Sequence, residues 1–253
     1  MRKKIEVLYE DEKMIAVVKQ PGVPSQSDRS NDEDIVSKVK NYLFDNSNSD
    51  TEPYAAIINR LDKPVGGIVL LAKDESTAAK LTDLLQKGEI KKYYQAVLSG
   101  ELKDESGKYE DYMTFDKKNN MAAISAPSAK GAKKAILEYE LLDEFETDNG
   151  ILSYVLINLI TGRHHQIRCQ MAAHGTPVYG DPKYGKLKAG RQNNPKGKKA
   201  PKGARPNQRQ NKKKGIALYS SRIELPHPVT GEKLILKSEP EGGAFSVIEL
   251  DEF

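Results

Sequence analysis

The chain has 253 residues, of which 38% are hydrophobic and 30% are charged, and its formal net charge is +4. This is an ordinary composition for a soluble domain, and no apolar run approaches the roughly 20 residues that a membrane-spanning helix needs. The N-terminus lacks an apolar signal core, and the single cysteine, Cys169, excludes an internal disulfide and a Cys-cluster zinc site. We therefore expect a cytoplasmic protein of one domain over residues 1–253, with no membrane contact and a buried, inert Cys169.

The first part of the chain predicts strands that alternate with two helices. Residues 8–19 are typical of a hairpin of two strands joined by a polar turn. Asp32 to Leu43 and Asp74 to Glu89 carry apolar residues at helical spacing, and Asp74 or Ser76 can cap the second helix. Between them, Gly67 to Ala72 is a continuous apolar run, which predicts a strand that is buried on both faces.

The later part of the chain predicts more strands than helices. One helix is expected from about His164 to His174. Because short loops between strands favour antiparallel pairing, we expect an α+β fold with a mixed, mainly antiparallel sheet and a few flanking helices. The further strands are predicted at residues 94–98, 135–142, 151–160, 216–225 and 233–237.

Residues 186–214 differ from the rest of the chain in charge. They hold 12 of the 40 Lys and Arg residues and no Asp or Glu, so the remainder has 28 basic and 36 acidic residues, a net charge of −8. With one large apolar residue, Leu187, the segment cannot bury enough surface to offset the cost of ordering. It predicts a disordered basic insertion that attracts RNA phosphates, with a functionally idle insertion as the alternative.

Two polar stretches are candidates for a catalytic site. Arg60 and Asp62 precede the apolar strand, but an aspartate there could equally be a turn residue paired with a nearby cation. Residues 161–185 hold three of the four histidines, so His164, His165, His174 and Asp181 are candidate zinc ligands. Helical spacing separates the second and third of these histidines by roughly 13 Å, which argues against a metal. The chain also lacks a Gly-x-Ser-x-Gly elbow and a phosphate-binding Gly-rich loop.

Together these stretches resemble the RluA-type pseudouridine synthases. The chain departs from the family pattern at Asn59, where His is usual, at Val65-Gly66, where Thr-Ser is usual, and at Gln20, where Pro is usual. The segments that match the family's motifs, in the family's order, are Asn59 to Lys73, Lys92 to Gly100, Gly162 to Arg168, Pro177 to Gly185 and His227 to Glu232.

The resemblance implies an enzyme that isomerises uridine to pseudouridine in structured RNA, with no cofactor and no metal. It implies that Asp62 is the catalytic carboxylate, which either adds to C1′ of the ribose or removes a ribose proton. Arg168 matches the arginine that pairs with this aspartate. Tyr94 matches the tyrosine that stacks on uracil, and its hydroxyl is a candidate to take the C5 proton.

The resemblance also implies that the uridine is flipped out of the RNA. Arg60 matches the residue that enters the RNA stack, with a phosphate contact as the alternative, and Arg163 and Lys92 serve RNA binding or packing. We expect a monomer that lacks an S4-type domain and acts on ribosomal RNA, with transfer RNA as the alternative substrate. The rival hypotheses are a catalytically inactive RNA-binding or ribosome-assembly factor of the same fold, and a hydrolase that uses Asp62.

Overall fold

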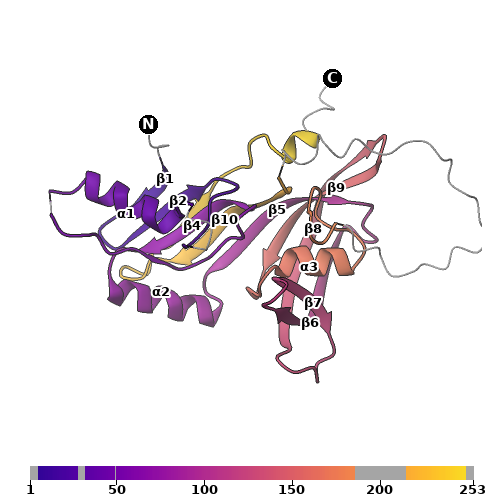
Figure 1. Ribbon diagram of the computed structural model, residues 1–253, viewed down its shortest axis with the longest axis horizontal. Coiled ribbons are helices and arrows are strands. Elements are labelled where there is room, and N and C mark those ends of the chain that lie inside the picture. Colours follow the sequence, from indigo (N-terminus) through magenta and orange to yellow (C-terminus); the bar gives the residue numbers. More distant parts are fainter. Residues whose placement is uncertain (1–4, 28–31, 49, 186–214, 249–253) are drawn as a thin grey trace, which may run out of the picture. The chain divides into compact units, whose positions relative to one another are not determined.

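The computed structural model describes residues 5–27, 32–48, 50–185 and 215–248 (Figure 1). The predicted insertion at residues 186–214 lies outside them. The chain divides into two compact units. Unit 1 comprises Met1–Gln95, Asn158–Ile160 and Leu218–Pro240, and unit 2 comprises Ala96–Ile157, Thr161–Ala217 and Glu241–Phe253. That residues 1–253 act as one domain stays a prediction.

Unit 1 is built on a sheet whose central strands are completely buried. In β2 (Met14–Lys19) and β4 (Gly66–Ala72) every residue is buried, which confirms the prediction from the continuous apolar run. These two strands pair antiparallel, whereas β4 pairs parallel with β10 (Leu218–Pro226). The strand order is β1-β2-β4-β10-β5, and β3 pairs with β4 and β11 with β10. The remaining strands are β1 (Glu6–Glu10), β3 (Ala56–Ile57), β11 (Lys233–Lys237) and the first half of β5 (Lys91–Ser99).

Two helices flank this sheet (Figure 1), and an aspartate begins each of them. In α1 (Ile35–Asp45) the Asp34 carboxylate accepts from the Ser37 amide at 2.9 Å, and in α2 (Glu75–Lys87) Asp74 accepts from the Thr77 amide at 2.7 Å. Such caps satisfy amides that a helix start leaves without a partner. Both predicted helices, and Asp74 as a cap, are confirmed.

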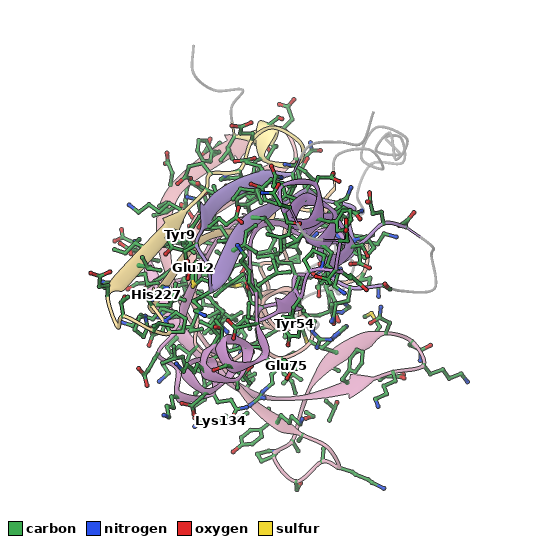
Figure 2. All side chains as sticks on the ribbon, turned by 90° about the vertical axis from the view of Figure 1, so that its left-hand side faces the viewer. Tyr9, Glu12, Tyr54, Glu75, Lys134 and His227 are labelled. Carbon is green, nitrogen blue, oxygen red and sulfur yellow. The ribbon has the colours of Figure 1, made fainter. Side chains whose placement is uncertain are left out.

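The turn after β10 is fastened to the opening hairpin of the same unit. The His227 Nδ1 accepts from the Thr230 amide at 3.0 Å, so its Nε2–H donates to Asp11 at 2.8 Å. Tyr9 donates to the same carboxylate at 2.7 Å, and Figure 2 shows Tyr9, Glu12 and His227 at one end of this unit. Burial acts to raise the pKa of Asp11, but these hydrogen bonds and those from backbone amides lower it to about 2. These contacts therefore hold the turn His227 to Glu232 against the β1–β2 hairpin.

Unit 2 contains the remaining strands of the eleven-stranded sheet and one helix, α3 (Gln166–Ala173). Its strand order is β5-β9-β8-β6-β7, with the second half of β5 at one edge. β6 pairs antiparallel with both β7 and β8. Its other strands are β6 (Ser106–Asp116), β7 (Met121–Ser125), β8 (Lys133–Thr147) and β9 (Gly150–Leu159). Cys169 packs in the core of unit 2, and burial raises its thiol pKa to about 11, as expected of an inert cysteine.

The predicted α+β class is confirmed. The described residues form eleven strands and three α-helices, and all strand pairs with a given register are antiparallel except β4 with β10. Every predicted strand and helix is present, whereas β3, β6 and β7 were not predicted. Within the described ranges, no helix is long and apolar enough to cross a membrane.

Candidate active site

Asp62 lies half-buried in the segment between β3 and β4, and the backbone on both sides of it is anchored. The Ser25 hydroxyl donates to the Leu61 carbonyl at 2.7 Å and accepts from the Leu61 amide at 2.9 Å. On the other side, the Gly22 amide donates to the Lys63 carbonyl at 2.7 Å. Because both neighbours are held by the segment after β2, the backbone of Asp62 has a fixed position in unit 1.

Lys19 reinforces this anchoring from the end of β2. Its side chain is fully buried, and its Nζ donates to the carbonyls of Val23 at 2.8 Å and of Lys63 and Gln20 at 3.3 Å. Burial lowers the pKa of Lys19 to about 7, while the negative charge of Asp62 acts in the opposite direction. Lys19 was not among the residues predicted from the sequence, although a lysine that ends a fully apolar strand is an unusual feature.

The β4 backbone explains one position that departs from the family motif, Asn59, and one that matches it, Gly67. The Asn59 side chain is buried, donates to the Ile68 carbonyl at 3.0 Å and accepts from the Leu70 amide at 2.8 Å. Its amide therefore pairs with β4 as a strand backbone would. Gly67 has a φ of +113°, and a Cβ there would lie 2.3 Å from the Ser220 carbonyl oxygen, so only glycine fits beside β10.

Tyr94 is buried on β5 in unit 1, with 5% of its surface exposed. Burial raises its pKa; the Ser220 hydroxyl acts to lower it, and the Asp62 charge raises it further. Tyr94 is therefore a neutral phenol at physiological pH. Ser220 is fully buried on the adjacent strand β10, and its hydroxyl makes no full hydrogen bond with any described residue. Ser220 was not among the residues predicted from the sequence, because its neighbours along the chain form no recognisable motif.

The other predicted residues of unit 1 differ in exposure. Arg60 is exposed, as an RNA contact requires. Lys92 is 8% exposed, burial lowers its pKa, and it makes no hydrogen bond or ion pair with the described residues. Since Lys92 and Tyr94 are two residues apart on β5, their side chains leave the same face of the strand. Their roles in RNA binding stay predictions.

Arg168 is fixed in unit 2 by a carboxylate from the Pro177 to Gly185 segment. Its Nε and Nη2 donate to the two oxygens of Asp181 at 2.7 and 2.9 Å, and both side chains are buried. Burial acts to raise the pKa of Asp181, but the Arg168 hydrogen bonds and charge lower it below its usual value. This bidentate pair sets the direction of the guanidinium group. The predicted pairing of Arg168 with Asp62 joins residues of different units and stays a prediction.

Comparison with known proteins identifies the family. The family described as RNA pseudouridylate synthase matches residues 13–173. The chain belongs to the RNA pseudouridylate synthase family. The predicted resemblance is thereby confirmed.

Relatives of this synthase family differ in their named substrates. The chain is 34% identical over 182 residues to the ribosomal large subunit pseudouridine synthase D of Haemophilus ducreyi, covering 71% of this chain and 50% of the relative. It is 29% identical over 264 residues to the tRNA pseudouridine synthase C of Yersinia pestis, covering 96% and 90%. An uncharacterised RNA pseudouridine synthase of Helicobacter pylori is 30% identical over 182 residues, and the chain spans only 55% of that protein's length.

Solved structures of the synthase family share the fold. The human RNA pseudouridylate synthase domain containing 4 superposes with a TM-score of 0.71 at 19% identity, covering 93% of this chain and 88% of that one. The human RNA pseudouridylate synthase domain containing 1 gives a TM-score of 0.68 at 17% identity, covering 93% and 83%. At these identities the likeness supports the fold alone.

The synthase motif before α3 is held by its own polar side chains. The side-chain Oε1 of Gln166 accepts from the Arg163 backbone amide at 2.9 Å and from the Thr161 hydroxyl at 2.7 Å. The exposed Arg163 side chain donates through Nε to the Lys134 carbonyl at 2.8 Å. His165, at a φ of +53°, pairs through Nδ1 with the Tyr184 hydroxyl at 2.9 Å. Arg163 is thus positioned on unit 2, and its predicted RNA contact stays a prediction.

The histidines of this region have separate partners within unit 2. His164 pairs with the Asn120 side chain at 2.9 Å, and His174 pairs with Asp111 at 3.1 Å and stacks on the Tyr109 ring. Asp181, the fourth candidate zinc ligand, forms an ion pair with Arg168.

Proposed function

We propose that this protein isomerises uridine to pseudouridine within RNA, with Asp62 as the essential carboxylate. The observation that carries the proposal is the anchored position of Asp62. Ser25 and Gly22 hold the backbone on both sides of this residue. The segment lies within the family match and resembles the family's motif around its catalytic aspartate. A carboxylate of fixed direction is what an attack on one ribose atom requires.

The reaction breaks the bond between N1 of uracil and C1′, turns the base, and joins C5 to C1′. Asp62, in its ionised form, either adds to C1′ as the base leaves or removes a ribose proton. In both routes Arg168 orients the carboxylate, and the Asp181 pair keeps this guanidinium from rotating. No electrons are gained or lost, so the proposed route needs no redox cofactor.

Tyr94 contributes as a neutral group. Because burial raises its pKa, the phenol keeps its proton at physiological pH, packs against uracil and donates a hydrogen bond. It can take the C5 proton only if its own proton leaves at the same time. The Asp62 carboxylate, once free of the sugar, is a base of the right charge to receive that proton. Transfer of the proton from Asp62 to N1 of the rejoined base then leaves Tyr94 neutral and Asp62 ionised for the next turnover.

The proposed substrate is ribosomal RNA, with the uridine flipped out of its stack. Relatives named for the ribosomal large subunit and for transfer RNA both match the chain. The experiment below therefore maps both classes of RNA. The exposed Arg60, two residues before Asp62, suits the space that a flipped base leaves behind, and Arg163 and Lys92 complete the proposed RNA contacts. The basic residues 186–214 supply attraction to phosphate. We propose RNA as the partner of this protein and the cytoplasm as its compartment.

The test compares pseudouridine maps of total RNA from cells with and without the gene. At least one site should disappear on deletion, return with the wild-type gene, and stay absent with Asp62→Asn. Asp83→Asn, which removes a carboxylate from an exposed position on α2, is the matched control and should restore the site.

Each outcome of this test decides one point. If no ribosomal or transfer RNA site disappears on deletion, the protein is not a synthase of these RNAs, and the rival hypothesis of a non-catalytic RNA-binding factor gains. If the site is lost on deletion but returns with Asp62→Asn, the enzyme assignment holds and Asp62 is not its essential carboxylate.

A further inference from the structure

A second basic segment lies on unit 2, within the described residues. Residues 113–134 contain five lysines and one acid, Asp116, a net charge of +4. Outside residues 186–214 the chain carries −8, so this concentration of positive charge opposes the rest of the protein. The segment covers the end of β6, all of β7 and the start of β8, and no motif discussed above includes it.

Most of these lysines lack an acidic partner. Lys117, Lys118, Lys130 and Lys133 are exposed, and none of them makes an ion pair with a described residue, whereas Lys134 pairs with Glu110. Many lysines of unit 1 behave differently, because each lies within 4 Å of a carboxylate. These paired lysines are Lys13, Lys38, Lys40, Lys63, Lys73 and Lys87. Positive charge that no carboxylate neutralises, on an otherwise acidic protein, favours binding of an anionic partner at this surface.

An exposed aromatic pair accompanies the lysines. Phe115, at the end of β6, is 39% exposed, and its ring centroid lies 4.0 Å from that of His164. The turn after β6 brings these groups together, because the Asn120 side chain pairs with His164 and the Asn120 carbonyl accepts from Lys183. Asn120 has a φ of +50°, a conformation that Asn tolerates better than most residues. The turn therefore presents two rings beside several cations.

We propose that this surface, made by Phe115, Lys117, Lys118, Lys133 and His164, binds the substrate RNA, the lysines contacting phosphates and the ring pair receiving an unstacked base. A basic surface with an aromatic platform is how proteins hold single-stranded nucleic acid without reading its sequence. Lys133 faces Met113, two residues before Phe115, in the β6–β8 pairing, and Lys117 and Lys118 follow Phe115 along the chain. The inference rests on the proposed function and names a contact for its substrate.

The lysine test measures binding of a fluorescein-labelled RNA hairpin with a uridine in its loop, by fluorescence anisotropy over a range of salt concentrations. Each neutralised phosphate contributes about −0.7 to the slope of log affinity against log salt for single strands. Lys117→Gln/Lys118→Gln should therefore make the slope shallower by about 1.4 and weaken binding roughly 25-fold at about 0.1 M salt. The matched control Lys38→Gln/Lys40→Gln removes the same charge from α1 and should change neither quantity.

The aromatic test uses Phe115→Ser, with Leu142→Ser as its control because that side chain is also exposed, at 45%, on β8. Loss of a stacking ring should weaken binding about tenfold and leave the salt slope unchanged. The control should bind like the wild type. Lys117→Arg/Lys118→Arg keeps the charge and should retain the wild-type slope.

The outcomes separate this inference from the proposed function. The inference is overturned if Lys117→Gln/Lys118→Gln keeps the wild-type salt slope. It is also overturned if Lys38→Gln/Lys40→Gln loses as much RNA affinity as the β6–β7 variant, because net charge alone would then explain binding. If the wild type forms no pseudouridine but the β6–β7 variants still lose RNA affinity as described, the RNA surface stands and the synthase proposal fails. Circular dichroism of each variant checks that it is folded.

Discussion

Replacing Lys19 by methionine is expected to remove a pH dependence from the stability of this protein. Burial lowers the pKa of Lys19 to about 7 from its ordinary 10.5, against the opposing charge of Asp62. On unfolding, the side chain returns to water and regains its ordinary pKa. Between these two values the unfolded chain binds more protons than the folded one, so the free energy of unfolding rises with pH across that window.

The expected rise can be worked out from the two pKa values. A difference of about 3.5 corresponds to about 5 kcal/mol between fully protonated and fully deprotonated Lys19. Between about pH 6.5 and 8.5 the same relation gives an increase of about 2 kcal/mol in the free energy of unfolding. Higher pH is avoided because Cys169, whose folded pKa is about 11, contributes the opposite slope once the thiol ionises in the unfolded chain. Methionine binds no proton, so Lys19→Met should lack the increase.

The measurement is urea unfolding followed by far-ultraviolet circular dichroism, since the chain has no tryptophan to report by fluorescence. Lys80→Met removes a lysine from an exposed position on α2 and is the control. Wild type and Lys80→Met should gain stability together as pH rises, while Lys19→Met stays flat. A Lys19→Met protein that gains as much as the wild type would refute the argument, because the pH dependence would then come from another group.

Two further predictions concern β10 and β4. Ser220→Ala should lower the single-turnover rate of pseudouridine formation about tenfold, by removing the hydroxyl beside Tyr94, with unchanged RNA affinity. The hydroxyl of Ser221 instead faces the Tyr93 carbonyl at 3.5 Å, so the control Ser221→Ala should keep the wild-type rate. Equal single-turnover rates for the two variants would contradict a positioning role for Ser220. Gly67→Ala should prevent stable folding because its Cβ would meet the β10 backbone at 2.3 Å. In the control Gly66→Ala the new Cβ meets only side-chain atoms, at 3.0 to 3.1 Å, so this variant should still unfold cooperatively in urea. If Gly67→Ala were as stable as Gly66→Ala, the close approach of β4 to β10 would be disproved.

The elements that could be predicted from the sequence are those whose hydrophobic pattern directly reflects burial. The run Gly67 to Ala72 has no polar residue because both of its faces are covered, and the spacing in α2 is typical of a helix with one buried face. β6 and β7 could not be predicted in this way. β6 buries only Met113 and β7 only Ala122, and the β6 residues around Met113 are polar, charged or aromatic. Their order comes from pairing with each other and with β8, which a local pattern does not contain.

The candidate site divides in a similar way. Asp62, Tyr94 and Arg168 could be selected because each stands in a short motif that resembles a known family. Ser25 and Lys19 could not, because their contacts join residues 36 and 44 positions apart and depend on the chain returning to the same place. Ser220 required the order of the strands, since only the adjacency of β10 and β5 brings it near Tyr94.

The anchoring contacts also explain why a changed motif can keep its geometry. The segment around Asp62 is held mainly through backbone groups, namely the amide and carbonyl of Leu61 and the carbonyl of Lys63. A side-chain replacement at a neighbouring position leaves these bonds intact, provided that the new residue satisfies its own surroundings. Asn59 meets this condition, because its amide both donates to and accepts from β4. The backbone position of Asp62 therefore depends more on residues 19–25, which the catalytic motif does not include, than on the motif residues that vary.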